Sequence, residues 1–133
     1  MSKKLYRELD IYFESEFDSE DLKAAISEAI VENESEFGEV TGGHCSQTDV
    51  RARYLPDSLE VEYIEFTTSI YDEEDCIASD ISGYAQVSFE YAAYYGCKDL
   101  DGGDSLDDCW NFRLLDGKLI FNIDIPEQRY DEL

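Results

Sequence analysis

The sequence predicts an α+β fold in which an antiparallel sheet of five or six strands packs against a single long helix. Several segments alternate apolar and polar residues, which is typical of half-buried strands. One segment carries apolar residues at helical spacing, and an Asp-Gly pair joins two alternating segments as in a β-hairpin. The 133 residues contain no linker or break in composition. Residues 1–133 are therefore expected to form one acidic domain, with a frayed tail over residues 126–133.

The first predicted element is a strand over residues 5–17. Its odd positions are mostly apolar and its even positions mostly acidic, so one face is expected to be buried and the other to face water. The carboxylates expected on the wet face are Glu8, Asp10, Glu14 and Glu16. Alternate residues of a strand lie about 6.7 Å apart, a spacing similar in scale to that of neighbouring phosphates in a nucleic acid.

A helix is predicted from Ser19 to Glu34, because apolar residues recur there every three or four positions. The acidic residues expected along it are Glu20, Asp21, Glu28 and Glu32, and Glu36 continues their spacing just beyond its end. The first two lie in the first turn, where the helix dipole favours negative charge. The last three follow at i, i+4 and i+8, and like charges at this spacing each cost a helix about 0.2–0.5 kcal/mol.

Four strands, and a possible shorter one before them, are expected after this helix. The glycines between residues 38 and 43 are expected to break the helical pattern, and the strands to cover residues 50–55, 58–71, 83–96, 110–115 and 119–125. An acidic turn is expected at Asp72, Glu73, Glu74 and Asp75. A solvated acidic loop is expected at residues 99–108, with the carboxylates Asp99, Asp101, Asp104, Asp107 and Asp108.

No pattern of residues indicates catalysis or a cofactor. The motifs GxSxG, GxxxxGK[ST] and HExxH are absent, and the single histidine, His44, lies in a glycine-rich segment away from any nucleophile motif. Counted from Asp99, the EF-hand pattern fails at positions 5, 6 and 12, so a looser divalent-cation site is only the weaker alternative to a solvated loop. We expect a protein that is not an enzyme and needs no cofactor.

Charge is the strongest functional signal in the chain. The sequence has 33 Asp and Glu against 10 Lys and Arg, a net charge of −23. Its 43% of hydrophobic residues distinguish it from acidic disordered tails. Solubility needs a net charge of only about 2–8 in a small domain. The surplus predicts an electrostatic field that acts on a strongly basic partner.

In size, charge and architecture the whole chain resembles the acidic DNA-mimic inhibitors of phages and plasmids, such as anti-CRISPR and anti-restriction proteins. The resemblance implies a stoichiometric inhibitor in the cytoplasm of a bacterial host cell. Its partner would be a basic nucleic-acid-binding protein or complex, and it would contact neither nucleic acid nor a membrane directly. The carboxylates named above would form the contact surface, with Tyr6 and Tyr12 as aromatic anchors.

Two other functions fit the same charge. One is an immunity-type antidote of a basic nuclease toxin, and the other is an acidic chaperone or adaptor for a basic protein. All three require a strongly basic partner, and they differ in whether the activity of that partner is abolished.

Overall fold

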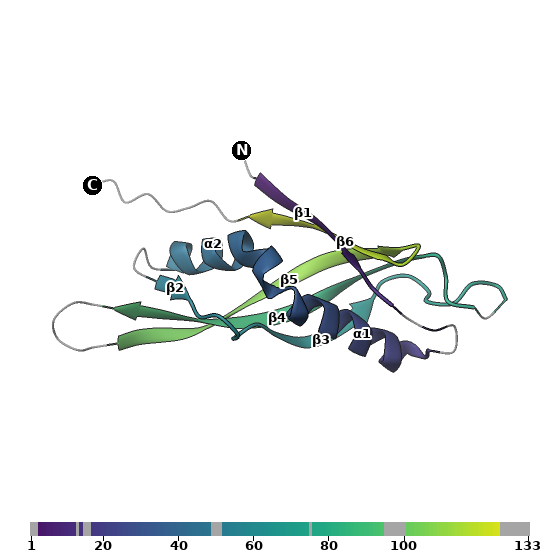
Figure 1. Ribbon diagram of the computed structural model, residues 1–133, viewed down its shortest axis with the longest axis horizontal. Helices are drawn as coiled ribbons and strands as arrows, with labels where there is room; N and C mark the ends of the chain where they lie inside the picture. Colours follow the sequence, from purple (N-terminus) through teal and green to yellow (C-terminus); the bar gives the residue numbers. More distant parts are fainter. Residues whose placement is uncertain are drawn as a thin grey trace.

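An antiparallel sheet of six strands forms the centre of the fold (Figure 1). The computed structural model describes residues 3–12, 14, 17–48, 52–74, 76–94 and 101–125. The strands are β1 (Lys3–Asp10), β2 (Ala52–Tyr54), β3 (Glu60–Phe66), β4 (Asp80–Tyr94), β5 (Asp101–Leu115) and β6 (Lys118–Ile125). Their order is β1-β6-β5-β4-β2, and β3 also pairs with β4. Every pairing is antiparallel, which confirms the predicted antiparallel sheet.

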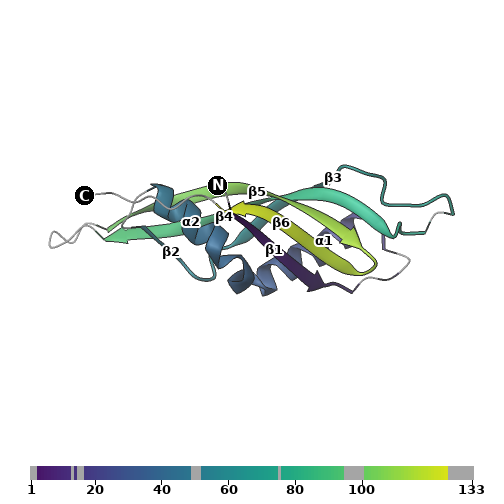
Figure 2. The same cartoon turned by 90° about the horizontal axis from the view of Figure 1, so that it is seen from above.

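Two short helices, instead of one long helix, cover one face of the sheet (Figures 1 and 2). They are α1 (Ser19–Glu32) and α2 (Gly38–Thr48), joined by the 3-10 turn η1 (Glu34–Phe37). The prediction of a single long helix is therefore wrong, and Glu36 lies in η1 and not on α1. No helix in the described part of the chain has the length and apolar character needed to cross a membrane.

The glycine-rich segment begins α2, although the sequence predicts a break there. Val40 and Cys45 of α2 are buried, as is Phe37 immediately before it. Glycine is a weak helix former, but most helical stability in proteins comes from the packing of an apolar face. Here the burial of Phe37 and Val40 outweighs the cost of the glycines.

The core lies between the helices and the sheet, with Phe37 at its centre. The Phe37 ring stacks on Trp110, with ring centroids 4.6 Å apart, and meets Phe121 edge-on at 5.1 Å. All three rings are buried, and α1 adds the buried side chains of Leu22, Ile26 and Ile30. Each large apolar side chain buried in this way contributes about 1.5–3 kcal/mol. The helices are thus held firmly on the sheet.

β1 is shorter than the predicted strand. Asp10 pairs with Lys118, the first residue of β6, and the Ile11 amide donates the next hydrogen bond to the Gly117 carbonyl. Beyond that point β6 offers no further partner, so the ladder ends. Glu14 consequently lies outside β1, and Glu16 lies outside the described residues.

β5 is longer than the predicted strand. It pairs with β4 from Leu115 back to Asp101, so residues 101–108 belong to a strand and the predicted loop is wrong from Asp101 onward. Asp99 lies outside the described residues. The ladder continues because β4 reaches Tyr94 and supplies partners along its whole length.

The remaining strands are shifted or shortened at their ends. β2 lies within the predicted residues 50–55, β3 occupies only the centre of residues 58–71, and β4 begins three residues before Gly83. The predicted hairpin turn is confirmed: Asp116 and Gly117 have φ of 50° and 81°, the left-handed conformations that a two-residue I′ turn requires. The predicted tail over residues 126–133 lies outside the described residues.

Candidate partner-binding surface

Cations partly neutralise the acidic side chains on the sheet face that the helices leave uncovered, called here the open sheet face. The ion pairs there are Arg113–Asp80, Lys118–Asp10 and Lys4–Asp124. Arg113 donates two hydrogen bonds to Asp80, of 2.8 and 2.7 Å, and they lower the pKa of that carboxyl. Asp10, a predicted binding residue, thus has a lysine beside it.

The helical layer, defined as residue 14 and residues 17–48, has fewer cations. Its exposed carboxylates are Glu14, Asp18, Glu20, Asp21, Glu28, Glu32, Glu36 and Glu39. Lys23 is the only lysine or arginine in this layer, and its Nζ lies 3.8 Å from Glu20. Arg7 reaches across from β1 and places its Nε 3.0 Å from Glu36 Oε1, although the N–H is not aimed at the oxygen. Eight exposed carboxylates of the helical layer thus have two cations beside them.

Two carboxylates at the start of α1 also have a structural role. The Asp18 side chain accepts a hydrogen bond of 2.9 Å from the Asp21 amide, and the Asp21 side chain accepts one of 3.2 Å from the Asp18 amide. This capping box fixes the first turn of the helix. Asp21 is thus held in place while its side chain stays exposed.

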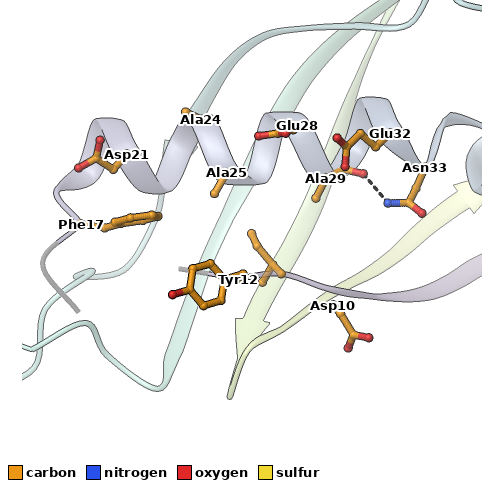
Figure 3. A pocket seen from close by; sticks show the side chains of 11 residues that line it. Asp10, Tyr12, Phe17, Asp21, Ala24, Ala25, Glu28, Ala29, Glu32 and Asn33 are labelled. Atoms are coloured by element: carbon orange, nitrogen blue, oxygen red, sulfur yellow. Dashed lines mark hydrogen bonds between the residues drawn. The ribbon is translucent and has the colours of Figure 1, made fainter. Parts of the chain in front are cut away.

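A groove with a volume of about 510 Å³ lies between α1 and the chain that leaves β1 (Figure 3). We call it the α1 groove; its lining residues are Asp10, Ile11, Tyr12, Phe17, Asp21, Ala24, Ala25, Glu28, Ala29, Glu32 and Asn33. Figure 3 shows Ala25 and Ala29 pointing from α1 toward the segment that carries Tyr12, with Glu28 higher on the helix in this view. The helical wall of the groove thus carries both methyl groups and carboxylates, and Ala25 and Ala29 face the segment with Tyr12.

The structure separates the two predicted aromatic anchors. Tyr12 borders the α1 groove and is 78% exposed, with its hydroxyl 3.4 Å from Glu14 Oε1. Tyr6 lies on the open sheet face and donates a hydrogen bond of 3.0 Å to Glu8, which raises the pKa of Tyr6. Only Tyr12 lies beside the carboxylates of α1.

The predicted acidic turn lies in the loop between β3 and β4, and none of its described residues lines the α1 groove. The Asp72 side chain accepts hydrogen bonds from the amides of Glu74 and Cys76, of 2.8 and 3.0 Å, so it shapes the loop itself. Glu73 and Glu74 are exposed, and Asp75 lies outside the described residues. This loop therefore presents a second, smaller acidic patch.

The carboxylates of β5 do not form one surface. Asp107 and Asp104 are exposed, and for Asp101 the structure describes only its place in the strand. Asp108 faces inward, and its side chain is 21% exposed. Among the described residues, no group of three or more His, Cys, Asp or Glu side chains is arranged to hold a metal ion.

Sequence reasoning missed the partners of Asp108. One of its oxygens is 2.9 Å from His44 Nε2 and 2.7 Å from Trp110 Nε1. Burial by itself would raise the pKa of Asp108, but the hydrogen bond and charge of His44, with help from Trp110, outweigh it and leave the pKa lowered. One signal for this was present in the sequence, because Asp108 lies two positions from Leu106 and from Trp110 and so shares their strand face, although the aspartates around it indicated a loop.

The structure therefore brings together one part of the predicted binding residues, those of α1 with Tyr12, and places the others on the open sheet face, in a loop or in the interior. No protein-family model, curated protein or solved structure matches the chain.

Proposed function

We propose that the protein is a stoichiometric inhibitor whose helical layer mimics the phosphates of a nucleic acid and occludes a basic nucleic-acid-binding surface. The partner is a basic protein or complex of a bacterial host, of the CRISPR or restriction kind, and the protein acts in the cytoplasm of that host. The observation that carries this proposal is the uneven neutralisation of charge. Eight exposed carboxylates of the helical layer face one lysine of that layer and one arginine from β1.

The helical layer has the physical properties that such a mimic needs. Glu28 and Glu32 are four residues apart on a regular helix, which corresponds to a rise of about 6 Å, similar in scale to the distance between neighbouring phosphates. Their positions are fixed because α1 is anchored by Leu22, Ile26 and Ile30 in the core. The backbone that carries these carboxylates is therefore already ordered before binding, which limits the cost of ordering to the side chains.

The same arrangement supports rapid capture of a cationic surface. Proteins bind nucleic acids largely through Lys and Arg contacts to phosphates and the release of counterions. A carboxylate surface with a net charge of −23 behind it steers such a basic site toward itself and competes for the same side chains. Inhibition then follows from occupancy alone, without a catalytic step.

The test is capture followed by titration. The tagged protein is incubated with nuclease-treated lysate of a bacterial host, the column is eluted with a salt ramp, and retained proteins are identified by mass spectrometry. A nucleic-acid-binding protein so identified is then purified, and its nucleic-acid binding is measured against increasing inhibitor. We expect one partner retained above about 0.3 M salt and inhibition that is complete at a fixed stoichiometric ratio.

Charge-matched variants show which surface acts. The helical variant Glu28→Gln, Glu32→Gln, Glu39→Gln and the sheet variant Glu60→Gln, Glu65→Gln, Asp107→Asn remove the same number of exposed charges. The concentration needed for half-maximal inhibition is expected to rise at least about tenfold more for the helical variant than for the sheet variant. Equal losses of inhibition in the two variants would contradict a binding face on the helices. A partner that stays active in the complex would contradict inhibition and favour the chaperone or adaptor function.

A further inference from the structure

We infer that the α1 groove binds an arginine side chain presented by a basic segment of the partner protein. The inference rests on the proposed function for the existence of a basic partner, and it assigns the place and the chemistry of the central contact. The groove has a volume of about 510 Å³, which lies within the range of pockets that hold small ligands. It therefore accepts a whole side chain, whereas an exposed helix face offers only surface contacts.

The walls of the groove combine apolar surface with unneutralised charge. Ala25 and Ala29 present methyl groups from α1 toward the segment that carries Tyr12 (Figure 3), and Ala24 and Ile11 also line the groove. Asp21, Glu28 and Glu32 add three carboxylates along the same helix. Within the described part of the chain, no lysine or arginine lines the groove, and Lys23 of α1 is turned to Glu20 instead. The complementary ligand has an apolar stem and a cationic head.

The aromatic wall favours arginine over lysine. Tyr12 is 78% exposed, and Phe17 lies beside it along the groove. A guanidinium is planar and weakly hydrated, so it stacks on an aromatic ring while it donates paired hydrogen bonds to carboxylates. A lysine ammonium is compact and strongly hydrated, and it gains less from such a ring. The methyl groups of α1 accommodate the aliphatic stem, which long basic side chains bury readily.

The test uses two blocked tripeptides of equal charge, tri-arginine and tri-lysine, titrated into the full-length chain and followed by amide chemical shifts. We expect the tri-arginine peptide to bind about two- to fivefold more tightly, in line with an exposed cation–π contact. The largest shift changes are expected at Tyr12, Ala25 and Ala29. Equal binding of the two peptides, or shift changes centred on the open sheet face, would overturn the inference.

Two variants and a matched control locate the contact without altering the net charge. Tyr12→Ala removes the exposed ring, and Ala24→Leu fills the groove from an exposed position of α1. Both are expected to abolish the preference for arginine. Tyr63→Ala removes another exposed tyrosine ring, 50% exposed, from β3 and is expected to keep the preference. An equal effect of Tyr63→Ala would overturn the assignment of the groove.

The two proposals fail in different ways. If the natural partner is inhibited equally well by the wild type and by Tyr12→Ala, the groove is not the arginine site, and the proposed function still stands. If the tri-arginine preference depends on Tyr12 but no nucleic-acid-binding protein is inhibited, the groove binds arginine and the proposed function is wrong.

Discussion

His44 of α2 and Asp108 of β5, 64 residues apart in the sequence, are joined by a hydrogen bond of 2.9 Å from Nε2 to Oδ2. A carboxylate can only accept, so Nε2 of His44 carries the proton. The same oxygen accepts a second bond of 2.7 Å from Trp110 Nε1. Because Trp110 stacks on Phe37, this polar contact adjoins the centre of the core and ties the helical layer to the sheet.

Substitution of Asp108 is therefore expected to destabilise the fold. Asp108→Asn keeps the shape of the side chain but replaces a charged acceptor of two hydrogen bonds, and the expected loss is about 1–3 kcal/mol in the free energy of unfolding. The neighbouring Asp107 is exposed on the opposite face of the strand, and Asp107→Asn is expected to change the stability by no more than about 0.5 kcal/mol. Urea unfolding of both variants measures the difference. Equal stabilities would show that the His44 contact contributes nothing.

The contribution of Asp108 is also expected to depend on pH. Its folded-state pKa is lowered, so the stabilisation is present above the ordinary pKa of an aspartate and is lost as the pH falls through the lowered value. The stability difference between wild type and Asp108→Asn should thus shrink as the pH falls below about 5. The other carboxylates titrate in both proteins, so their effect on stability cancels in the difference between wild type and Asp108→Asn. A difference that grows as the pH falls below about 5 would contradict the assignment.

These residues also show what the sequence can and cannot predict. Strand alternation and the Asp-Gly turn are local signals, and they located the β5–β6 hairpin and the centre of β4 correctly. His44 and Asp108 lie where local signals indicate loops, namely glycines and a run of aspartates. Burial of Phe37 favours the helix that carries His44, and pairing with β4 favours the strand that carries Asp108. Both interactions depend on residues far away in the sequence.

The candidate binding surface was also predictable only where it depends on a single helix or strand. Glu28 and Glu32 are exposed on a helix, as their spacing predicts, whereas Glu36 lies in η1 and Glu14 lies beyond β1. The α1 groove could not be predicted, because it exists only where the segment with Tyr12 folds back along α1. A pattern within one element reveals which face is exposed, but it does not reveal which other element lies beside that face.

Neutralising the helical carboxylates is expected to stabilise the protein while it weakens partner binding. Glu28 and Glu32 are exposed, lie at i and i+4, and have no cation beside them among the described residues. Glu28→Gln with Glu32→Gln should therefore raise the stability by about 0.2–0.5 kcal/mol at low salt, visible as a higher melting temperature. The gain should shrink in 0.5 M NaCl, because salt screens exposed charges.

Glu36→Gln is the matched control for this prediction, because it removes a carboxylate that lies beside Arg7. It is expected to leave the melting temperature unchanged or to lower it. A lower melting temperature for the Glu28 and Glu32 variant would mean that those carboxylates make stabilising contacts.

The aromatic centre of the core is expected to be the most sensitive part of the fold. Phe37 is fully buried and contacts both Trp110 and Phe121. Phe37→Ala leaves a cavity between the helices and the sheet and should cost about 3–5 kcal/mol. Val31→Ala, on the exposed side of α1, should change the stability by less than about 0.5 kcal/mol. Chemical denaturation compares them, and a cost below 1 kcal/mol for Phe37→Ala would show that the core closes around the loss.

Replacement of two glycines by alanine is expected to change the stability of the protein in opposite directions. A Cβ on Gly83 of β4 would lie 2.4 Å from the Glu65 carbonyl oxygen and 2.9 Å from Cζ of Phe112. The first of these atoms is backbone of the paired strand β3, so Gly83→Ala must displace that strand and should cost about 1–3 kcal/mol. A Cβ on Gly42 of α2 would meet no atom within 4 Å. Gly42→Ala should therefore stabilise the helix by about 0.5–1 kcal/mol.

Urea unfolding of the two glycine variants measures both effects on the same scale. Opposite signs would confirm that β3 packs closely on β4 and that α2 forms in spite of its glycines. An unchanged stability for Gly83→Ala would show that β3 moves away from β4 at no cost. Loss of stability in Gly42→Ala would show that this glycine is needed where α2 lies, against the expectation from helix propensity.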